Sequence, residues 1–359
     1  MKVLQILTEL GPGGAERVAL DLSAGLLARG HSVSVISLKP PPANRTIPDA
    51  FISLGIVPEY LYMDGIRDIF RFFRLRKRIR ELSPDVVHSH LMHPNLLSRL
   101  ACIGLKKRLL NTVHISERRT NRGIFFFLDR LTFPLCSACN AVSFASAAFQ
   151  EEKLGLKKGT VKVVYNGVDA VPRPEAAVLE RRKEEWGLAG CSRIAGCLGR
   201  LDPQKGFDLF LRLLPALSAR VPEGETGGIV ILGEGTERSR LEALAAETPP
   251  NLKVVLPGFY ADAKQMIWMF DCFVMPSRYE GYGLVLAEAM STGAPVVVNP
   301  VDSLPELCRF YPNSVLSDFN RTETADAVAE ALFRGRIEPR LISSKKEMTG
   351  QYVKLYKDL

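Results

Sequence analysis

The chain has 359 residues, of which 47% are hydrophobic and 24% are charged, and its formal net charge at pH 7 is +8. This composition is typical of a globular protein with room for two domains, and it excludes a disordered or fibrous chain. No run of about twenty apolar residues occurs, and the apolar segment before Glu9 is too short for a secretory leader. The seven cysteines lie mostly in apolar runs, as reduced thiols do, so we expect a cytoplasmic protein.

The first half of the chain alternates short β-branched runs with longer amphipathic segments, which predicts a parallel sheet covered by helices on both faces. Residues 1–170 are also the basic half, with 24 Lys and Arg against 14 Asp and Glu. We therefore expect this half to face something anionic, such as a membrane surface, a phosphorylated acceptor or nucleic acid. The expected strands are 3–8, 32–38, 85–90, 109–114 and 141–144, and the expected helices include 15–29, 66–82 and 145–154.

A glycine-rich turn from Gly11 to Glu16 follows the first expected strand and opens the first expected helix. Such a turn lets the backbone approach a phosphate or a sugar closely, and the helix N-terminus adds partial positive charge. A dinucleotide-binding fingerprint would need a third glycine where Glu16 stands, and an acidic residue where Ser37, Leu38 and Lys39 end the second strand. Hydride transfer is therefore disfavoured, and a plain tight turn remains the alternative.

A basic amphipathic segment runs from Arg67 to Arg80, with apolar residues at helical spacing and seven Arg and Lys among them. This composition is typical of an interfacial helix that docks on anionic lipid. A second basic-then-aromatic run extends from Arg118 to Phe127. The equally weighted alternative is a core-facing helix with a solvated basic face.

His88, His90 and His93 cluster at the end of one expected strand, with no carboxylate or cysteine nearby. We expect them to line a ligand cleft or to cap the strand rather than to bind zinc. Cys136 and Cys139 lack a second metal-binding pair, so we expect them to pack in the core.

The second half repeats the strand and helix alternation after a Pro- and Ala-rich stretch that we take as the linker. Two α/β halves joined once predict ligand binding between them, at the carboxyl ends of their strands. The expected strands are 194–198, 228–232, 254–256, 272–275 and 295–298, and the expected helices are 207–217, 238–247 and 284–291. The expected domains are 1–170 and 171–340, with a closing helix at 341–359.

Two loops of the second half carry charges suited to a nucleotide sugar. Arg200 and Lys205 directly follow an expected strand, and a guanidinium fork with an ammonium suits a diphosphate. Glu280 precedes an expected helix that contains Glu288, and eight residues of helical rise would separate their carboxylates by roughly 12 Å. That span suits two ends of one long ligand and is too wide for most pairs of hydrolase carboxylates. A solvated loop and an ordinary exposed helix are the alternatives.

Six features in chain order carry a resemblance to a known family. They are residues 13–16 (GGAE), 84–90 (PDVVHSH), 166–169 (NGVD), 199–206 (GRLDPQKG) and 232–235 (LGEG), and the pair Glu280 and Glu288. Together they resemble glycosyltransferase family 4, whose GT-B fold has two Rossmann-like, doubly wound parallel-sheet domains facing across a cleft. The resemblance covers nearly the whole chain, and it implies that residues 1–170 bind the acceptor and residues 171–340 bind the donor. It implies retaining transfer from UDP-, GDP- or similar nucleotide sugars with no metal and no other cofactor, and the sequence has no Asp-x-Asp triplet.

The resemblance also implies a role for each matching residue of the second half. Arg200 and Lys205 would hold the diphosphate and offset the charge of the leaving group. Glu288 would bind the ribose hydroxyls. The donor hexose would be held by Glu280 and by the backbone of the next four residues, Gly281, Tyr282, Gly283 and Leu284.

Three more positions receive roles in the same way. His114, at the end of an expected strand, would sit against the donor sugar opposite Glu280. Gly14 would lend its amide near the phosphates or the acceptor, and Gly258 would help to frame the base. The sequence departs from the family pattern after His114, where Glu117 could share the role of that histidine.

The interpretation that follows is a retaining, metal-independent glycosyltransferase acting on a lipid-linked or saccharide acceptor in envelope polysaccharide assembly, at the cytoplasmic face of the membrane. A nucleotide-sugar epimerase of the same fold and a non-catalytic sugar-binding protein are the alternatives. A nucleic-acid partner is not expected, because the basic half lacks interleaved aromatics and a recognition-helix pattern.

Overall fold

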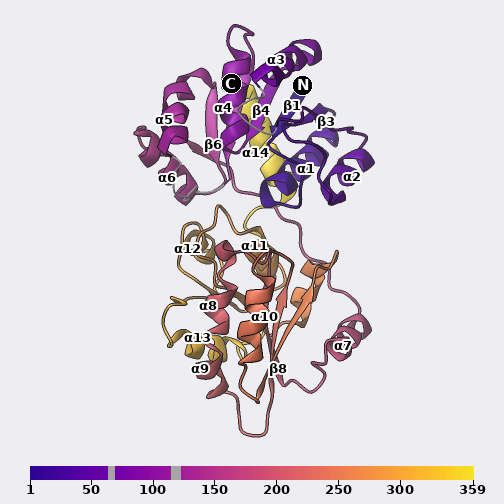
Figure 1. The fold of residues 1–359 in the computed structure, drawn as a ribbon, viewed down its shortest axis with the longest axis vertical. Coiled ribbons are helices and arrows are strands. Elements are labelled where there is room, and N and C mark those ends of the chain that lie inside the picture. The colour runs from indigo at the N-terminus through magenta and orange to yellow at the C-terminus, as the bar shows by residue number, and fades with distance from the viewer. Residues whose placement is uncertain (64–68, 115–122) are drawn as a thin grey trace. The chain divides into compact units, whose positions relative to one another are not determined.

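The computed structural model describes residues 1–63, 69–114 and 123–359, and the chain divides into two compact units. The first unit comprises Met1–Gly167 and Ser343–Leu359, and the second comprises Val168–Ile342. Each unit is a parallel sheet with helices packed on its faces (Figure 1). The second unit thus begins at Val168, close to the expected start at residue 171.

The first unit is built on a parallel sheet whose described strands follow the order β3-β2-β1-β4-β5-β6-β7. The central strands are buried along almost their whole length, as expected of strands covered on both faces. The strands are β1 (Lys2–Leu7), β2 (Ser32–Ser37), β3 (Glu59–Tyr60), β4 (Val86–His90), β5 (Arg108–Val113), β6 (Ala138–Ala141) and β7 (Lys162–Val163).

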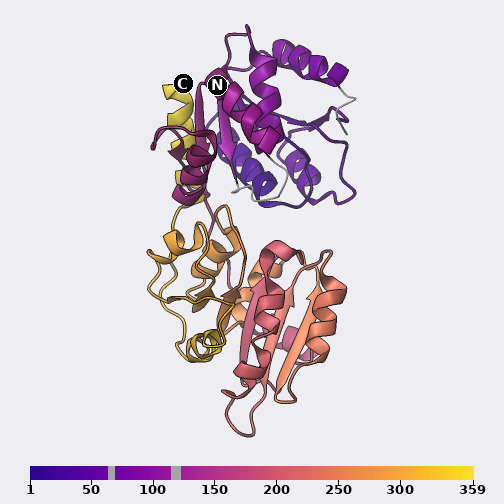
Figure 2. The same ribbon diagram turned by 60° about the vertical axis from the view of Figure 1, so that its left-hand side comes forward.

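Helices cover both faces of this sheet (Figure 2). On one face, Leu4, Ile6 and Val87 pack with α3 and α4, whereas Leu7 and Val35 on the other face pack with α1 and α2. The helices of the first unit are α1 (Gly14–Leu27), α2 (Thr46–Ser53), α3 (Ile69–Leu82), α4 (Met92–Cys102), α5 (Gly123–Thr132), α6 (Phe144–Leu154) and α14 (Lys345–Asp358).

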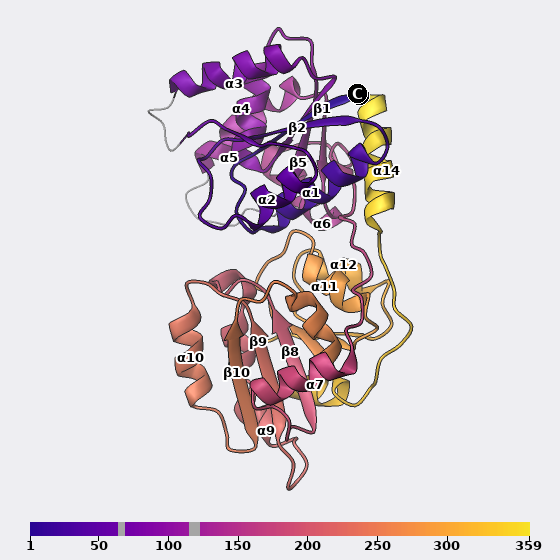
Figure 3. The same ribbon diagram turned by 90° about the vertical axis from the view of Figure 1, so that its right-hand side faces the viewer.

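The C-terminal helix α14 belongs to the first unit, which the sequence pattern alone did not indicate. It begins with a capping box, in which Ser344 and Glu347 each bond the other's backbone N–H. The Tyr356 hydroxyl lies 2.7 Å from Nδ1 of His88 in β4, and the Asn140 amide of β6 donates to the Tyr352 hydroxyl at 3.1 Å. The helix, yellow in Figure 3, is therefore anchored to the sheet by polar contacts as well as by packing.

The second unit has a parallel six-stranded sheet of order β10-β9-β8-β11-β12-β13. Its strands are β8 (Arg193–Leu198), β9 (Gly227–Leu232), β10 (Leu252–Gly258), β11 (Cys272–Met275), β12 (Val296–Val298) and β13 (Ser314–Leu316). Its helices are α7 (Ala176–Glu185), α8 (Phe207–Leu211), α9 (Leu214–Ser218), α10 (Arg238–Ala246), α11 (Leu284–Met290), α12 (Leu304–Cys308) and α13 (Thr324–Ala331).

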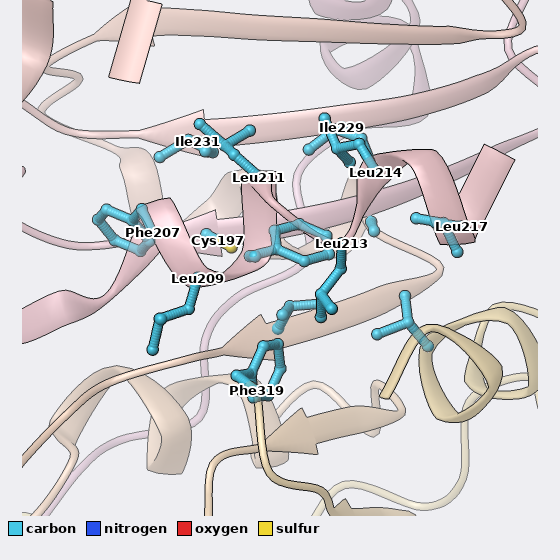
Figure 4. Close-up of a cluster of buried hydrophobic side chains, with 14 of the residues drawn as sticks. Cys197, Phe207, Leu209, Leu211, Leu213, Leu214, Leu217, Ile229, Ile231 and Phe319 are labelled. Carbon is cyan, nitrogen blue, oxygen red and sulfur yellow. The ribbon is translucent and has the colours of Figure 1, made fainter. Parts of the chain in front are cut away.

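In the core of the second unit, α8, α9 and α13 pack against the sheet. Phe207 and Phe319 lie in it with leucines of α8 and α9 and isoleucines of β9 (Figure 4). Phe210 of α8 belongs to the same cluster. The single helix expected over 207–217 is in fact two helices, α8 and α9. Pro215 explains the break, because it has no N–H to donate and its ring clashes with the carbonyl one turn earlier.

Among the described residues, no helix is both long and apolar enough to span a bilayer. All seven cysteines are described, and none forms a disulfide. Residues 66–68 of the expected helix 66–82 lie outside the described residues. So do residues 118–122, which are half of the run from Arg118 to Phe127.

Candidate functional site

The candidate site of the second unit lies where its strand order reverses. The chain runs outward from β8 to β9 and β10 on one side, and from β11 to β12 and β13 on the other. The loops after β8 and β11 therefore leave the same edge of the sheet in opposite directions, which is where open α/β sheets bind ligands. These two loops carry Arg200, Lys205 and Glu280, so the fold brings together the residues that the sequence predicted.

The centre of the site is an ion pair between these loops. The Lys205 ammonium lies 2.5 Å from Oε1 of Glu280, and the Ser277 hydroxyl donates to the same oxygen at 3.0 Å. The Glu280 side chain is 7% exposed and the Lys205 side chain 18% exposed, so both charges are largely withdrawn from water. When a ligand binds, the ammonium can take a phosphate as its new partner and the carboxylate can take a sugar hydroxyl. The cost in desolvation is low, because both charged groups are already largely withdrawn from water.

Arg200 extends from the first of these loops into solvent. Its side chain is 61% exposed, and its Nε donates to Oδ2 of Asp202 at 2.5 Å. The guanidinium therefore keeps most of its donors available, and a short contact within the loop orients it. Arg200 can thus offer a bidentate fork to an anion at the edge of the site.

Close backbone approaches hold the loop after β8 in place. A Cβ at Gly233 would lie 1.8 Å from the Gly199 carbonyl oxygen, and a Cβ at Gly206 would lie 2.2 Å from the Pro276 carbonyl oxygen. Both positions have positive φ, +143° and +65°, so glycine is required by conformation and by space. The glycines of the motifs at 199–206 and 232–235 therefore bring three loops together.

Arg278 joins the loop after β11 both to the loop after β8 and to Asp208 of α8, and no role was predicted for Arg278 or Asp208. The Arg278 guanidinium donates to both carboxylate oxygens of Asp208 at 2.8 Å and to the Pro203 carbonyl at 2.8 Å. Gln204 Nε2 donates to the Tyr279 carbonyl at 3.0 Å. Burial raises the pKa of Asp208, but its bonds to Arg278 and the nearby Arg240 outweigh burial and hold that pKa below its ordinary value.

The segment after Glu280 is held by the loop that follows β12. The Glu280 backbone N–H donates to Oδ2 of Asp302 at 3.0 Å, and the Ser303 hydroxyl donates to the Tyr282 carbonyl at 3.0 Å. Gly283, at φ +91°, is the N-cap of α11. The expected turn between Glu280 and α11 is therefore present. It is buried, and hydrogen bonds to the loop after β12 hold it in place.

Glu288 lies in α11, as expected, and is half-buried. The predicted separation of roughly 12 Å from Glu280 treated all eight intervening steps as helical. That assumption is wrong, because α11 begins only at Leu284 and the preceding residues form a turn. Gly258 ends β10 at the same edge of the sheet, where its carbonyl accepts from the Gly233 N–H at 3.0 Å.

Gly14 and His114 belong to the first unit. The predicted place of His114 opposite Glu280, and that of the Gly14 amide near the phosphates or the acceptor, stay predictions. Gly14 is the first residue of α1, directly after the turn at the end of β1. His114 directly follows β5, is half-buried, and its Nε2 lies 2.9 Å from Nδ1 of His90. Burial lowers the pKa of His114 to about 3, so its imidazole is neutral. Glu117 lies outside the described residues.

The expectation that the histidines after residue 87 line a cleft or cap a strand is wrong for two of them. His88 and His90 are fully buried in β4, and burial lowers the pKa of each well below its ordinary value. His88 bonds Tyr356 and Thr112, and His90 bonds Gln5 and His114. Within the described part of the chain, no cluster of His, Cys, Asp or Glu is suited to hold a metal ion.

The residues missed by sequence reasoning are those that position others. Gln5, Ser277, Asp302 and the pair Asp208 and Arg278 act through contacts between segments far apart in the chain. The only available signal was that Ser277 and Arg278 stand directly before the motif that carries Glu280.

Two doubly wound units, each with ligand-edge loops at its switch point, are the architecture of the GT-B class. The structure of Anabaena HepE in complex with UDP matches the chain with a TM-score of 0.79 and 19% identity, over 100% of both chains. This likeness establishes the fold.

The sequence comparisons then establish the family. Residues 12–171 match the family model Glycosyltransferase Family 4, and residues 180–348 match Glycosyl transferases group 1. The chain is 30% identical over 302 residues to a phosphatidyl-myo-inositol mannosyltransferase of Mycolicibacterium smegmatis, covering 81% of this chain and 74% of the relative. The protein of the same name from Propionibacterium freudenreichii is 27% identical over 351 residues, covering 92% and 84%. The chain therefore belongs to glycosyltransferase family 4, group 1, and is a glycosyltransferase.

Proposed function

We propose that the protein is a retaining glycosyltransferase that moves a hexose or an N-acetylhexosamine from a UDP- or GDP-type donor to a lipid-linked or saccharide acceptor in envelope glycan assembly. The observation that carries this proposal is the Lys205–Glu280 ion pair at the switch point, with Arg200 on the same loop as Lys205. Lys205 would supply a cation for the phosphates and Glu280 a carboxylate for the sugar hydroxyls, and the two groups are hydrogen-bonded to each other.

The names of similar proteins support the donor and acceptor classes. Two relatives are named phosphatidyl-myo-inositol mannosyltransferases, a name that contains a phospholipid, and another is named a lipopolysaccharide core biosynthesis mannosyltransferase. HepE, which shares the fold, binds UDP-glucose in a solved structure. A nucleotide-sugar donor and a glycan or glycolipid product are therefore the classes that we propose for this chain.

The proposed reaction is a displacement on one face of the sugar. The bond from the anomeric carbon to the leaving phosphate oxygen breaks, the acceptor hydroxyl oxygen bonds to that carbon, and the acceptor proton passes to the leaving phosphate. Arg200 and Lys205 stabilise the negative charge that grows on the diphosphate, so no metal is needed for this purpose. Glu280 holds the hexose through its hydroxyls, and Glu288 binds the ribose.

Donor binding is tested by thermal unfolding with UDP, GDP, ADP and their hexose conjugates, in the presence of EDTA. We expect one nucleotide family to raise the melting temperature, because a ligand that binds only the folded state stabilises it. The reaction product should keep the anomeric configuration of the donor. No shift with any nucleotide, or a shift that EDTA abolishes, would contradict the proposed donor site or its metal independence.

Two variants and a control test the assigned residues. Lys205→Ala and Arg200→Ala should each lower kcat by about a hundredfold or more, the usual effect of removing one group that stabilises transition-state charge. Arg321→Ala is the matched control, because this arginine of the same unit is 75% exposed and pairs with Asp318 only at 3.8 Å. Unchanged turnover in both site variants would show the assignment to be wrong.

We further propose that the first unit contacts an anionic membrane at the cytoplasmic face, where a lipid-linked acceptor would lie. The strongest support is α5, because its polar side chains are buried and its apolar side chains are exposed, the reverse of the usual pattern of a surface helix. Its polar Asp129 and Thr132 are buried, whereas Ile124, Phe127 and Leu131 are 61–66% exposed. An exposed apolar stripe of this kind marks an interaction surface.

Helix α3, which also packs beside α4, supplies mainly positive charge, together with Phe73, which is 61% exposed. Leu75 and Ile79 are fully buried in the core, so α3 faces the core, as one of the two alternatives stated. Arg74, Lys77 and Arg80 are exposed on its outer side. Both helices pack beside α4 on the same face of the sheet, so exposed basic and apolar groups occur on one face, which suits an anionic lipid surface.

A vesicle sedimentation assay tests this surface. The protein should sediment with phosphatidylglycerol-containing vesicles and not with phosphatidylcholine alone. Phe127→Ser together with Leu131→Ser should weaken sedimentation, and Phe310→Ser, at an exposed phenylalanine of the second unit, should not. Equal sedimentation of all variants, or none with anionic vesicles, would contradict the proposal.

A further inference from the structure

A chain of buried hydrogen bonds leads from α1 to His114 through the middle of the first unit. The Ser23 hydroxyl donates to the Ala19 carbonyl at 2.8 Å, and Gln5 Nε2 lies 2.6 Å from that hydroxyl. Gln5 Oε1 lies 3.0 Å from Nε2 of His90, and Nδ1 of His90 lies 2.9 Å from Nε2 of His114. The chain ends at the carboxyl edge of the sheet, beside the switch point between β1 and β4.

The direction of every bond in this chain follows from its first member. The Ala19 carbonyl can only accept, and it accepts from both Ser23 and Gln5, the latter at 3.1 Å. The amide nitrogen of Gln5 must therefore point toward α1, so its oxygen points toward His90. An acceptor at that place requires the proton of His90 to be on Nε2.

The state of His90 then sets that of His114. His90 is fully buried, and burial, with smaller contributions from His88 and His114, lowers its pKa well below the ordinary value. A neutral imidazole with its proton on Nε2 has a bare Nδ1, which can only accept. His114 must supply the proton, so its own Nε2 carries the hydrogen.

We propose that Gln5 and His90 are positioning residues that hold His114 in the Nε2–H tautomer, so that its Nδ1 is an acceptor for a hydroxyl of the bound ligand. The tautomer stands on the geometry of the first unit alone. The identity of the ligand rests on the proposed function: the hydroxyl would belong to the donor sugar, against which the sequence comparison of motifs predicts His114 to sit. A neutral acceptor selects hydroxyl donors and disfavours a carboxylate or a phosphate oxygen at the same place.

The tautomer is read directly by nitrogen NMR of the full-length protein labelled with ¹⁵N-histidine. The chain has five histidines, so single substitutions assign the signals, and His31→Gln provides a first assignment away from the network. We expect protonated Nε2 and bare Nδ1 at both His90 and His114 at neutral pH. The opposite tautomer at His114, or a mixture of both, would overturn the inference.

Two substitutions at position 90 separate positioning from simple filling of space. His90→Gln keeps the direction of the chain, because its amide can donate to Gln5 and accept from His114. His90→Leu removes both functions. We expect about a tenfold or larger loss of kcat/KM in His90→Leu, as for a buried donor left without a partner, and recovery to within about threefold in His90→Gln.

Failure of the inference and failure of the proposed function give different results. If the wild-type tautomer is as expected and addition of the nucleotide sugar shifts the Nδ1 signal of His114, both stand. If the tautomer is as expected and the Nδ1 signal does not move when donor binds, the contact with the sugar is refuted. If His90→Leu does not fold, the wild-type spectrum still decides the tautomer. Equal activity of the two variants at position 90 would refute the positioning role.

Discussion

Replacing Arg278 by methionine should weaken both the second unit and its ligand site. The substitution keeps an unbranched apolar stem and removes three bonds at 2.8 Å, two to Asp208 and one to the Pro203 carbonyl. Hydrogen bonds to charged groups contribute about 1.5–3 kcal/mol each when protected from water. Arg278 is 37% exposed and Asp208 keeps Arg240 at 3.1 Å, so screening reduces the total to about 2–3 kcal/mol.

The expected loss corresponds to a fall of about 4–12 °C in melting temperature for a unit of this size. Donor affinity and turnover should fall as well, because Arg278 joins the loop of Glu280 to the loop of Lys205. Thermal and urea unfolding measure the first effect, and nucleotide titration measures the second. Arg321→Met is the matched control and should change neither.

The reasoning would be refuted by a variant that unfolds within about 0.5 kcal/mol of the wild type, the range of ordinary surface substitutions. A variant that is destabilised as expected but binds the nucleotide sugar with unchanged affinity would refute the link between the two loops and leave the stability argument intact.

Three further predictions concern the first unit. Arg99→Met should cost about 3–5 kcal/mol in urea unfolding, because it leaves the buried carboxylate of Asp129 without its cation. Tyr356→Phe should cost about 1 kcal/mol by removing the bond to His88 and should leave the second unit's unfolding unchanged. Stability should fall as pH drops below about 6.5, by up to about 1.4 kcal/mol per pH unit for each buried histidine. Unfolded histidines take up protons there, while folded His88 and His90, with their lowered pKa values, do not; a flat unfolding profile between pH 7 and 5 would contradict this.

The site of the second unit was predictable because its residues stand in local motifs at strand ends. Arg200 and Lys205 follow β8, and Glu280 follows β11, so the α/β pattern alone put them at one edge of a sheet. The pattern did not show that β8 and β11 are neighbours. It also did not show that Asp208 pairs with Arg278, since a contact between residues 70 positions apart leaves no mark in spacing.

The first unit was less predictable because its key contacts are buried and polar. A histidine in a strand can cap the strand, line a site or lie in the core, and only the partners decide. His88 lies in the core because Tyr356, more than 260 residues later, supplies a hydroxyl there. The amphipathic pattern at the C-terminus predicted a helix, but it could not predict which sheet that helix would meet.

The net charge of each half does not show which half holds the anion-binding cations of the candidate donor site. The basic excess lies in residues 1–170, yet the cations of the candidate donor site, Arg200 and Lys205, lie in the half whose net charge is negative. The basic residues of α3 are exposed and spread along a helix, whereas Lys205 is largely buried against a carboxylate. Salt screens exposed charges strongly and buried ones weakly.

Raising the salt concentration should therefore separate the two anionic partners. Binding to anionic vesicles should weaken steeply between low and high salt, because each exposed Lys or Arg contributes about 1 kcal/mol near such a surface only while it is unscreened. Nucleotide affinity, measured by titration in the same buffers, should change far less. Equal sensitivity of the two would mean that one diffuse basic surface serves both partners, and the focused site around Lys205 would lose its support.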